Sequence, residues 1–543
     1  LAEFYPCLPA GRPKNPDEAT PNKYYAYVLR CCDGSLYKGH TDDLPRRFKQ
    51  HCEGLVEWTK TRLPVDLLYW DEYETREEAI EREKWLKSGV GREWLAQQFP
   101  KEKPIAYLWA RTVRCESPNC GAEIPLMRSF WLCKKANRKK ALRYTGTTDN
   151  LPQFEIFEPE TDKEVQNGTV TRAKATCLAC GTVLSPERVR AQLAAQHGGA
   201  NAVFDAKGNR IGGARLLAVV TLREGQTGRY YRLPTKADYQ AVYKAQQKLK
   251  KILDEWERNG KKGLCPVPDE PTPVGGGSGA GRAFSVQKYG MLKWGDLFTA
   301  RQKLSLITIA YKIMTVREKQ NLAIVLSRIT DLENSLCGWR ASSECIDHLF
   351  ARQALPIVWD FGEASPMAGA TGSWDSLLDR SAEGYFTSST LNETGLVQQA
   401  DACQSPLPED SVSVWFTDPP YYDAIPYSDL SDFFFVWLKR TLPGHPLLRD
   451  PFDPQNGLSP KAAEIVQDET KKINSRCKDR AFFEEAMGKA FAEGRRILKE
   501  DGISSVVFAH KTTEGWEALL TGLIHGGWTI TGSWPIATEM ESR

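Results

Sequence analysis

Apolar and polar residues alternate in short runs along residues 23–99, and this pattern predicts a compact α/β unit. Three of the runs have the period of two that is expected of half-buried strands: residues 24–31, 35–39 and 66–73. Asp33 and Gly34 separate the first two runs, and this pair favours the tight turn of a β-hairpin.

Helices are predicted after the second and the third of these strands. Residues 43–51 have a helical pattern, and the aspartates at 42–43 are placed to cap its first turn. Thr75 is expected to cap a second helix over residues 76–87, because Glu78 stands where a capping box requires it.

Beyond residue 99 the pattern changes several times. Residues 104–232 look β-rich, residues 235–259 predict one long charged helix, and residues 266–281 form a loop rich in Pro and Gly. From Phe284 onward helical and strand patterns alternate, which is typical of a doubly wound parallel sheet. The expected fold class is therefore α/β, with a smaller α/β unit and a β-rich region before the main sheet.

The composition limits the class of protein but does not identify it. The chain has 543 residues, of which 41% are hydrophobic and 26% charged, and its net charge is only +3. A nucleic-acid partner would therefore have to be recognised by local patches rather than by overall charge. No apolar run approaches the roughly 18 residues of a membrane span, and no signal peptide is visible, so we expect a cytoplasmic protein without membrane contact.

Four of the 14 cysteines form two closely spaced pairs: Cys115 and Cys120, and Cys177 and Cys180. Two such pairs on tight turns are typical of a zinc ribbon, in which four thiolates surround one structural zinc ion. Cys133 is an alternative ligand, although its apolar neighbours favour a place in the core. The basic residues at 134–143 lie between the pairs, where they could contact DNA phosphates or form a solvated face.

The apolar run at 412–416 ends in Asp418, Pro419, Pro420 and Tyr421. Two consecutive prolines cannot donate backbone hydrogen bonds, so they end the strand in a rigid loop with free carbonyls. Such a loop suits a flipped-out base, because Asp418 and the Pro419 carbonyl can accept hydrogen bonds from an amine while Tyr421 stacks on the ring.

This loop and its continuation through residue 438 resemble the amino-group DNA methyltransferases, most closely the adenine-specific DNA methylases that contain a zinc ribbon. Other stretches carry the same resemblance: residues 106–113, 294–299, 301–302 and 506–511. The resemblance implies that residues 418–421 hold the target amine, with adenine favoured over cytosine, while S-adenosylmethionine donates the methyl group to DNA.

A glycine-rich cofactor turn is harder to find. Residues 275–279 have the glycines but no strand before them, and residues 357–363 have a strand but a poor cradle after it. Asp401 follows a short strand predicted from Leu396 and is the residue we expect to contact the cofactor. Because the chain begins at Leu1 rather than Met, we expect a piece of a longer reading frame, with the cofactor turn upstream.

Residues 25–29, 37–39, 43–47 and 79–92 resemble the GIY-YIG nuclease domain. Carried over by position, Tyr27 and Tyr37 match the two motif tyrosines, Arg47 the helix arginine and Glu83 the metal-binding glutamate. The resemblance implies phosphodiester hydrolysis, in which a tyrosine activated by a nearby cation acts as the base, Arg47 neutralises phosphate oxygens, and Mg²⁺ on Glu83 clamps the scissile phosphate.

Four other residues bear on the resemblance to the nuclease domain. Lys49 and His51 share a helix with Arg47 and are placed to assist it. Ala26 and Lys38 depart from the usual motif residues, at positions that do not carry the chemistry.

Together the two resemblances predict five segments: an upstream methyltransferase end and linker (1–22), the nuclease-like domain (23–99), a zinc-ribbon region (104–232), a charged helix and loop (233–282), and a methyltransferase domain (283–543). The leading hypothesis is a DNA adenine methyltransferase that carries an inserted endonuclease-like domain. Two alternatives stay open. In one the nuclease is the main activity, through restriction–modification or a mobile insertion, and in the other the chain is an inactive DNA-binding fragment.

Overall fold

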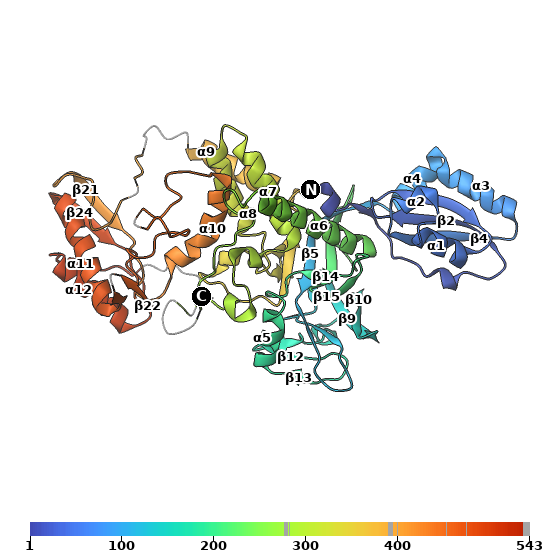
Figure 1. Cartoon of the computed structure of the whole chain (residues 1–543), viewed down its shortest axis with the longest axis horizontal. Helices are drawn as coiled ribbons and strands as arrows, with labels where there is room; N and C mark the ends of the chain where they lie inside the picture. The colour runs from blue at the N-terminus through green and yellow to red at the C-terminus, as the bar shows by residue number, and fades with distance from the viewer. Residues whose placement is uncertain are drawn as a thin grey trace.

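The chain is elongated, with three bodies in a row (Figure 1). The N-terminal unit (residues 24–98) lies at one end, the central body (residues 101–388 and 427–441) in the middle, and the C-terminal unit (residues 401–423 and 464–535) at the other end. The computed structural model describes residues 1–275, 281, 283–388, 395–398, 400–451, 453–473 and 475–535.

The N-terminal unit is built on an antiparallel sheet of three strands in the order β3-β2-β4. The strands are β2 (Tyr24–Cys31), β3 (Leu36–Thr41) and β4 (Val65–Tyr73), and the hairpin between β2 and β3 lies where the sequence predicts it. Strand β3 forms one edge of the sheet, so its outer side is open to a ligand.

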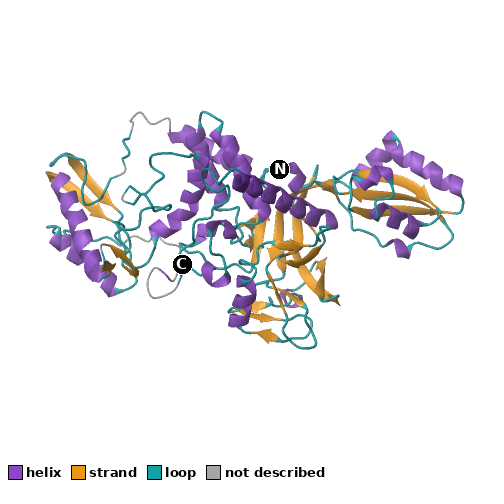
Figure 2. Cartoon of the chain, in the orientation of Figure 1, coloured by secondary structure: helices purple, strands orange, loops and turns teal. Residues whose placement is uncertain are grey.

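Helices cover both faces of this sheet (Figure 2). They are α1 (Leu44–Cys52), α2 (Glu57–Lys60), α3 (Arg76–Lys87) and α4 (Gly89–Gln98). Tyr25, Tyr27 and Leu29 pack with Leu44 of α1, whereas Ala26 and Val28 pack against α3 and α4. The alternation of β2 thus buries both of its faces. Asp43 caps α1, and the predicted capping box between Thr75 and Glu78 is present in α3.

Both ends of the N-terminal unit meet the central body at one place. Strand β1 (Leu8–Pro9) pairs antiparallel with the start of β5 (Lys101–Ala110), so the chain leaves and returns side by side. Arg30 tightens this junction, because its buried guanidinium donates to the carbonyl of Pro9 at 2.7 Å and forms an ion pair with Asp66 at 3.0 Å.

The central body is organised around a five-stranded antiparallel sheet. Its other strands are β16 (Arg215–Arg223), β17 (Tyr230–Arg232) and β20 (Asp360–Ala364), and both β16 and β20 pair with β5. Helices α6 (Lys236–Arg258) and α7 (Ala300–Met314) cover one face, where Val242 and Leu304 pack on Tyr107.

Helices α8 (Lys319–Thr330), α9 (Trp374–Ser388) and α10 (Tyr427–Thr441) complete the larger core of this body. Smaller antiparallel sheets extend from it: β6 (Thr112–Arg114) with β7 (Glu123–Pro125), β8 (Trp131–Lys135) with β9 (Arg138–Thr148) and β10 (Leu151–Phe157), β11 (Val170–Thr171) with β12 (Lys174–Thr176) and β13 (Val183–Leu184), β14 (Ala202–Phe204) with β15 (Arg210–Gly213), and β18 (Trp339–Arg340) with β19 (Cys345–Ile346). Helix α5 (Pro186–Ala194) follows β13, and short 3₁₀ turns punctuate the chain: η1 (Ala2–Phe4), η2 (Pro16–Glu18), η3 (Asp162–Glu164), η5 (Val286–Tyr289), η6 (Trp294–Leu297) and η7 (Leu349–Ala351).

The C-terminal unit contains two parallel strands, β21 (Val412–Thr417) and β24 (Leu498–Val506). Helices α11 (Arg480–Ile497) and α12 (Thr513–His525) pack on one side of them, and a small hairpin joins β22 (Asp468–Ile473) to β23 (Arg476–Lys478). Between β21 and β24 the chain passes through α10, the hairpin of β22 and β23, and α11, which is a long crossover of the kind that parallel pairing requires.

The predicted doubly wound sheet is not what the structure contains. In the described part of the chain, β21 and β24 are the only strands paired in parallel, and the larger sheet is antiparallel. The prediction rested on the alternation of strand and helix patterns from Phe284 onward, but β20 of that region pairs antiparallel with β5. Both strands are largely buried, and a buried apolar run does not reveal the direction of its neighbours. None of the described helices is long and apolar enough to cross a membrane.

Candidate functional site

Two tyrosines of the N-terminal unit lie side by side around a glycine of the edge strand. Tyr27 pairs in register with Gly39, and the ring centroids of Tyr27 and Tyr37 are 6.1 Å apart. A Cβ atom at Gly39 would lie 2.7 Å from the Tyr27 hydroxyl and 2.9 Å from a ring carbon of Tyr37. Only glycine therefore fits between the two rings, which explains its place in the second motif.

Helix α1 carries two further groups to the hydroxyl of Tyr27. Arg47 donates from Nε to this oxygen at 3.4 Å, and Nε2 of the buried His51 lies 2.8 Å from it. Asp43 starts the helix by accepting a hydrogen bond from the backbone of Arg46, and this cap fixes how α1 faces the sheet. The structure thus brings Tyr27, Tyr37 and Arg47 together, and it places His51, which the sequence named only as an assisting residue, closer to Tyr27 than Arg47 is.

A chain of hydrogen bonds determines which ring nitrogen of His51 carries the proton. The Thr59 hydroxyl donates to the carbonyl of Val56 at 3.3 Å, so its oxygen is left to accept from Nδ1 of His51 at 2.8 Å. The Nε2 atom then carries no proton and accepts a hydrogen bond from the Tyr27 hydroxyl. Burial, and then the charge of Arg47, lower the pKa of His51 to about 4, which keeps the ring neutral at physiological pH.

The lowering of the Tyr27 pKa that is expected from a nearby cation is outweighed by other effects. Burial and the neighbouring Tyr37 raise the pKa of Tyr27 well above its ordinary value, although Arg47 acts in the opposite direction. A nearby cation alone therefore does not make Tyr27 a base at neutral pH, and Nε2 of His51, 2.8 Å away, is the acceptor placed next to its proton.

Glu83 lies on the other side of the sheet from Tyr27. Its carboxylate binds Nδ1 of His40 and the ammonium of Lys87, and it is 13% exposed. Burial acts to raise the pKa of Glu83, but the hydrogen bonds from Lys87 and His40 outweigh burial and lower it. His40 pairs in register with Ala26, which faces α3, so Gly39 and His40 of the edge strand separate Glu83 from the tyrosines.

Sequence reasoning missed His40, Thr59 and Trp58. Trp58 packs on Tyr37 with ring centroids 5.4 Å apart and receives Arg62 over its face. His40 directly follows the second motif and could have been noticed for that reason, whereas no signal marks Thr59 or Trp58. Lys49, which was expected to assist, is 76% exposed and pairs with Glu53.

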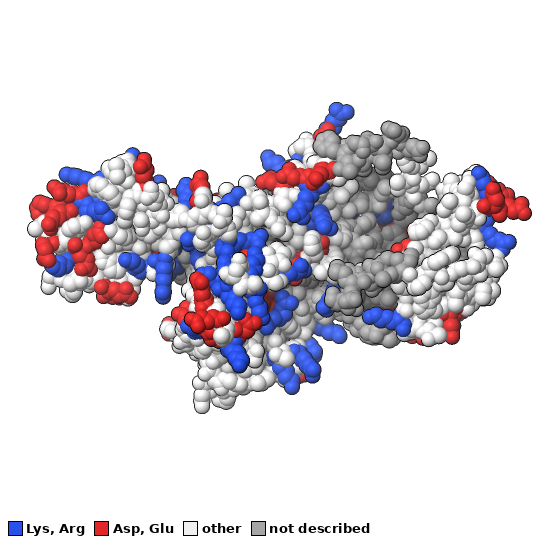
Figure 3. Space-filling model, turned by 180° about the vertical axis from the view of Figure 1, so that it is seen from behind, with Lys and Arg blue, Asp and Glu red and all other residues white. Residues whose placement is uncertain are grey.

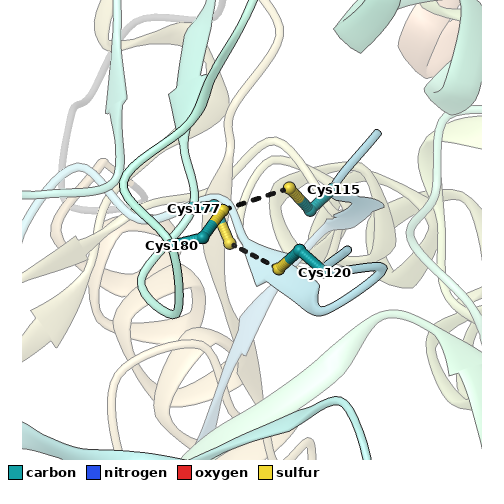
Figure 4. A group of neighbouring side chains, drawn as sticks. All are labelled: Cys115, Cys120, Cys177 and Cys180. Atoms are coloured by element: carbon teal, nitrogen blue, oxygen red, sulfur yellow. Dashed lines mark hydrogen bonds between the residues drawn. The ribbon is translucent and has the colours of Figure 1, made fainter. Parts of the chain in front are cut away.

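The four predicted zinc ligands converge in the central body (Figure 4). The Sγ atoms of Cys115 and Cys180 are 3.6 Å apart, those of Cys120 and Cys177 are 3.7 Å apart, and all four lie within 4.8 Å of one another. These separations exclude disulfides, whose sulfurs are about 2 Å apart. The alternative ligand Cys133 is fully buried and donates to the carbonyl of Arg138.

The Asp418 loop opens into a cavity of about 1820 Å³ beside the C-terminal unit. Asp418, Pro420 and Tyr421 line it together with Asp401, while the ring of Tyr421 meets Phe508 edge to face at 5.4 Å. The next residue, Tyr422, has a left-handed φ of 45°, which is a strained conformation for an aromatic residue.

The strand predicted before Asp401 is absent from the described residues, whereas residues 357–363 form no cofactor cradle, in line with the expectation from the sequence. Leu396 and Val397 form no strand and are 98% and 100% exposed, so Asp401 does not follow a strand. Glu363 is fully buried and accepts from Arg301 at 2.7 Å and from Trp109 at 2.7 Å, so the stretch 357–363 ties the central sheet to α7 and forms no cradle. Of the glycine-rich stretch 275–279, residues 276–279 lie outside the described residues.

The GIY-YIG catalytic domain matches residues 23–93 of this chain. A UPF0213 protein, YsiG, of Lactococcus lactis subsp. lactis (strain IL1403) is 38% identical over 92 residues, which are 16% of this chain and 88% of that protein. A UPF0213 protein of Streptococcus sanguinis (strain SK36) is 43% identical over 92 residues, 17% of this chain and 94% of its own length. The UPF0213 protein SSP2268 of Staphylococcus saprophyticus is 40% identical over 68 residues, 12% of this chain and 83% of its own length.

These comparisons confirm the GIY-YIG prediction for the N-terminal unit. No solved structure matches the chain significantly. The resemblance of the later residues to DNA methylases stays a prediction.

Proposed function

We propose that this chain, which belongs to the GIY-YIG family through the catalytic domain at residues 23–93, hydrolyses phosphodiester bonds in DNA. The observation that carries the proposal is the hydrogen bond between the Tyr27 hydroxyl and the unprotonated Nε2 of His51. It gives the phenol proton a neutral acceptor, so that this proton can shift toward Nε2 as the Tyr27 oxygen takes a proton from the attacking water.

The proposed reaction begins at this pair. As the water attacks phosphorus, the Tyr27 oxygen takes its proton while the phenol proton moves to Nε2 of His51, so that no free phenolate forms. The bond from phosphorus to the leaving oxygen then breaks, and a proton from the site or from solvent completes the leaving alcohol. Arg47, which interacts with both tyrosines, would donate to the phosphate oxygens and stabilise the charge that develops there.

Glu83 fits the divalent cation that the family implies, because its lowered pKa leaves an anionic carboxylate that reaches the edge of the sheet. Mg²⁺ held there would neutralise charge on the scissile phosphate and on the leaving oxygen. The proton transfers are assigned to Tyr27 and His51, and the contact with the phosphate oxygens to Arg47.

Nicking of supercoiled plasmid by the whole chain in Mg²⁺ tests this function. Wild type is expected to nick, whereas Tyr27→Phe and Glu83→Gln should each lose the activity. Lys49→Ala is the matched control, since Lys49 is exposed on the same helix as Arg47 and should leave the rate unchanged. Equal nicking by wild type and both active-site variants would rule the proposal out.

We also propose that Cys115, Cys120, Cys177 and Cys180 hold one structural zinc ion. Four thiolates at the usual zinc–sulfur bond length of about 2.3 Å in a tetrahedron have sulfurs roughly 3.8 Å apart, and two of the pairs here are at 3.6 and 3.7 Å. Metal analysis of the purified chain should find one zinc per chain, and Cys115→Ser should lose it and unfold at lower temperature. Cys345→Ser, which alters a cysteine outside this cluster, is the control.

A second candidate function is methyl transfer to an amino group of DNA, favouring adenine, with S-adenosylmethionine as donor. The observation that favours it is that Asp418, Pro420, Tyr421 and Asp401 line one cavity next to a strained residue. Asp418 and the Pro419 carbonyl would accept from the target amine, Tyr421 would stack on the base, and Asp401 would meet the cofactor.

Incubating DNA with the chain and methyl-labelled cofactor tests the second candidate, with Asp418→Ala as the variant that should lose labelling. If wild type leaves the DNA unlabelled, the methyltransferase proposal is wrong. A chain that binds DNA but neither nicks nor labels it would instead be the inactive DNA-binding protein that forms the remaining alternative.

A further inference from the structure

A pocket of about 560 Å³ lies where the N-terminal unit meets the central body. We call it the junction pocket and define it by Lys38 of β3, Arg92 of α4, Lys101 at the start of β5, Glu224 after β16, and the apolar Leu36 and Phe99. Three cations and one carboxylate thus face a space that also has an apolar wall. Such a lining suits an anion that carries sugar or base surface with it.

The three cations of the junction pocket outnumber its one carboxylate, Glu224. Among the described residues, Lys38, Arg92 and Lys101 have no ion pair with an acidic side chain, and Glu224 has none with them. Burial, and then the charges of Arg92 and Lys87, lower the pKa of Lys38, so like charges are held close together. Bringing cations together in this way is unfavourable unless an anion binds between them.

The basic hairpin of the central body behaves differently. Lys134 and Lys139 pair with Asp162, Arg138 with Glu344, and Arg143 with Glu155. This pairing favours the solvated face over the DNA contact that the sequence left open. Figure 3 shows Asp and Glu gathered at the outer end of the N-terminal unit, and Lys and Arg between that end and the central body.

The junction pocket shares a side of the sheet with Glu83, across the edge strand from the two tyrosines. Lys38 stands between Tyr37 and Gly39 on the edge strand, and it points to the same side of the sheet as His40, the partner of Glu83. A polyanion that crosses the edge of β3 at Gly39 would therefore reach Lys38 next. A DNA backbone is long enough to cover the apolar wall of the junction pocket as well as to meet its cations. A single free phosphate would leave that wall uncovered, so DNA backbone is the better occupant.

We propose that the junction pocket binds a phosphodiester of the DNA backbone beside the scissile one, with Lys38, Arg92 and Lys101 as its contacts. The identity of the ligand rests on the proposed nuclease function, whereas the site itself rests on the cavity and its unpaired cations. The central body would then help to place the substrate, because Lys101 belongs to its sheet.

Binding of a labelled DNA duplex, measured by fluorescence anisotropy in EDTA over a range of salt, tests the inference without cleavage. The double variant Lys38→Ala/Arg92→Ala should weaken binding, and the slope of log Kd against log salt should fall by about 2 because two phosphate contacts are lost. The control is Lys49→Ala/Lys84→Ala, which removes two exposed cations of the same unit from outside the pocket and should change the slope by much less. Arg92→Lys alone should keep the wild-type slope.

The outcomes separate the two proposals. If the pocket variant and the control have the same slope, the junction pocket does not bind DNA, even if wild type nicks plasmid in Mg²⁺. If the slope falls as expected but wild type never nicks, the pocket stands and the nuclease proposal fails. Circular dichroism of the pocket variant checks that it is folded, and both substituted side chains reach solvent, so their removal should not unfold the unit.

Discussion

The N-terminal unit and the C-terminal unit both carry residues that the sequence singles out, yet only the first unit closes its site. In the N-terminal unit the Tyr27 hydroxyl lies 2.8 Å from His51 and 3.4 Å from Arg47. In the C-terminal unit Asp418 and Tyr421 line an open cavity of about 1820 Å³. The groups of the first site hydrogen-bond to one another, whereas those of the second line a wide cavity.

The supporting sheets explain this difference. Three strands of the N-terminal unit have helices on both faces, so the apolar residues of β2 are buried. The two parallel strands of the C-terminal unit leave apolar residues exposed: Val414 (64%), Phe416 (67%) and Ile503 (69%). A site is fixed in place when the elements behind it are packed on both sides, and that condition holds only for the first unit.

His51→Gln is expected to have the largest effect on the comparison. Removing a general base typically lowers a rate by about 10²–10⁴-fold, so plasmid nicking should fall by that amount while DNA binding in EDTA stays the same. A variant that nicks as fast as wild type would mean that the contact with Tyr27 only packs the site and plays no part in proton transfer.

The pH dependence of folding stability should differ between the N-terminal unit and the C-terminal unit. His51 has its pKa lowered from 6.5 to about 4, so the unfolded chain binds more protons than the folded one between these values. Stability of the N-terminal unit should therefore be full above pH 6.5 and fall by about 3 kcal/mol as the pH drops to 4.

Hydrogen exchange read by mass spectrometry checks this prediction. Peptides from α1 of wild type should lose protection relative to the same peptides of His51→Gln as the pH is lowered, while peptides from α11 should be alike in the two proteins. Equal behaviour of the α1 peptides would show that His51 is not held neutral by folding.

Thr59→Val should have a smaller effect, since it removes one hydrogen bond and keeps the shape of the side chain. Without the Thr59 oxygen, His51 no longer holds its proton on Nδ1, and a fraction of molecules would place it on Nε2 instead. Nicking is expected to fall roughly 10-fold, the equivalent of one lost hydrogen bond. Thr59→Ser keeps the hydroxyl, so its nicking rate should stay near that of wild type. If Thr59→Ser lost as much activity as Thr59→Val, the packing of the Thr59 methyl group would be the cause rather than the hydrogen bond.

Asp418→Ala is expected to have no effect on nicking, and so gives the sharpest negative test of the comparison. The two units lie at opposite ends of the molecule, so charges in one are screened from the other. A change of more than about twofold in the nicking rate would reveal coupling between the units that their separation does not predict.

The local structure of the N-terminal unit could be predicted from the sequence because its signals are short-range. Alternation in β2, the turn at Asp33 and Gly34, and the capping box of Thr75 each involve residues a few positions apart, and all three are present. Strand direction in the central body could not be predicted in this way. The pairing of β5 with β16 and β20 joins residues more than a hundred positions apart, and a buried apolar run fits a parallel or an antiparallel sheet equally well.

By itself the sequence determined which residue types stand in the motif of the N-terminal unit, and which cysteines are spaced to share a metal ion. Only the tertiary structure decided which side chains act on Tyr27. The Thr59 hydroxyl and the neutral state of His51 depend on burial and on a contact between helix and turn, and neither has a sequence pattern. The junction pocket likewise exists only because Lys101, far from Lys38 in the sequence, returns beside it where β1 pairs with β5.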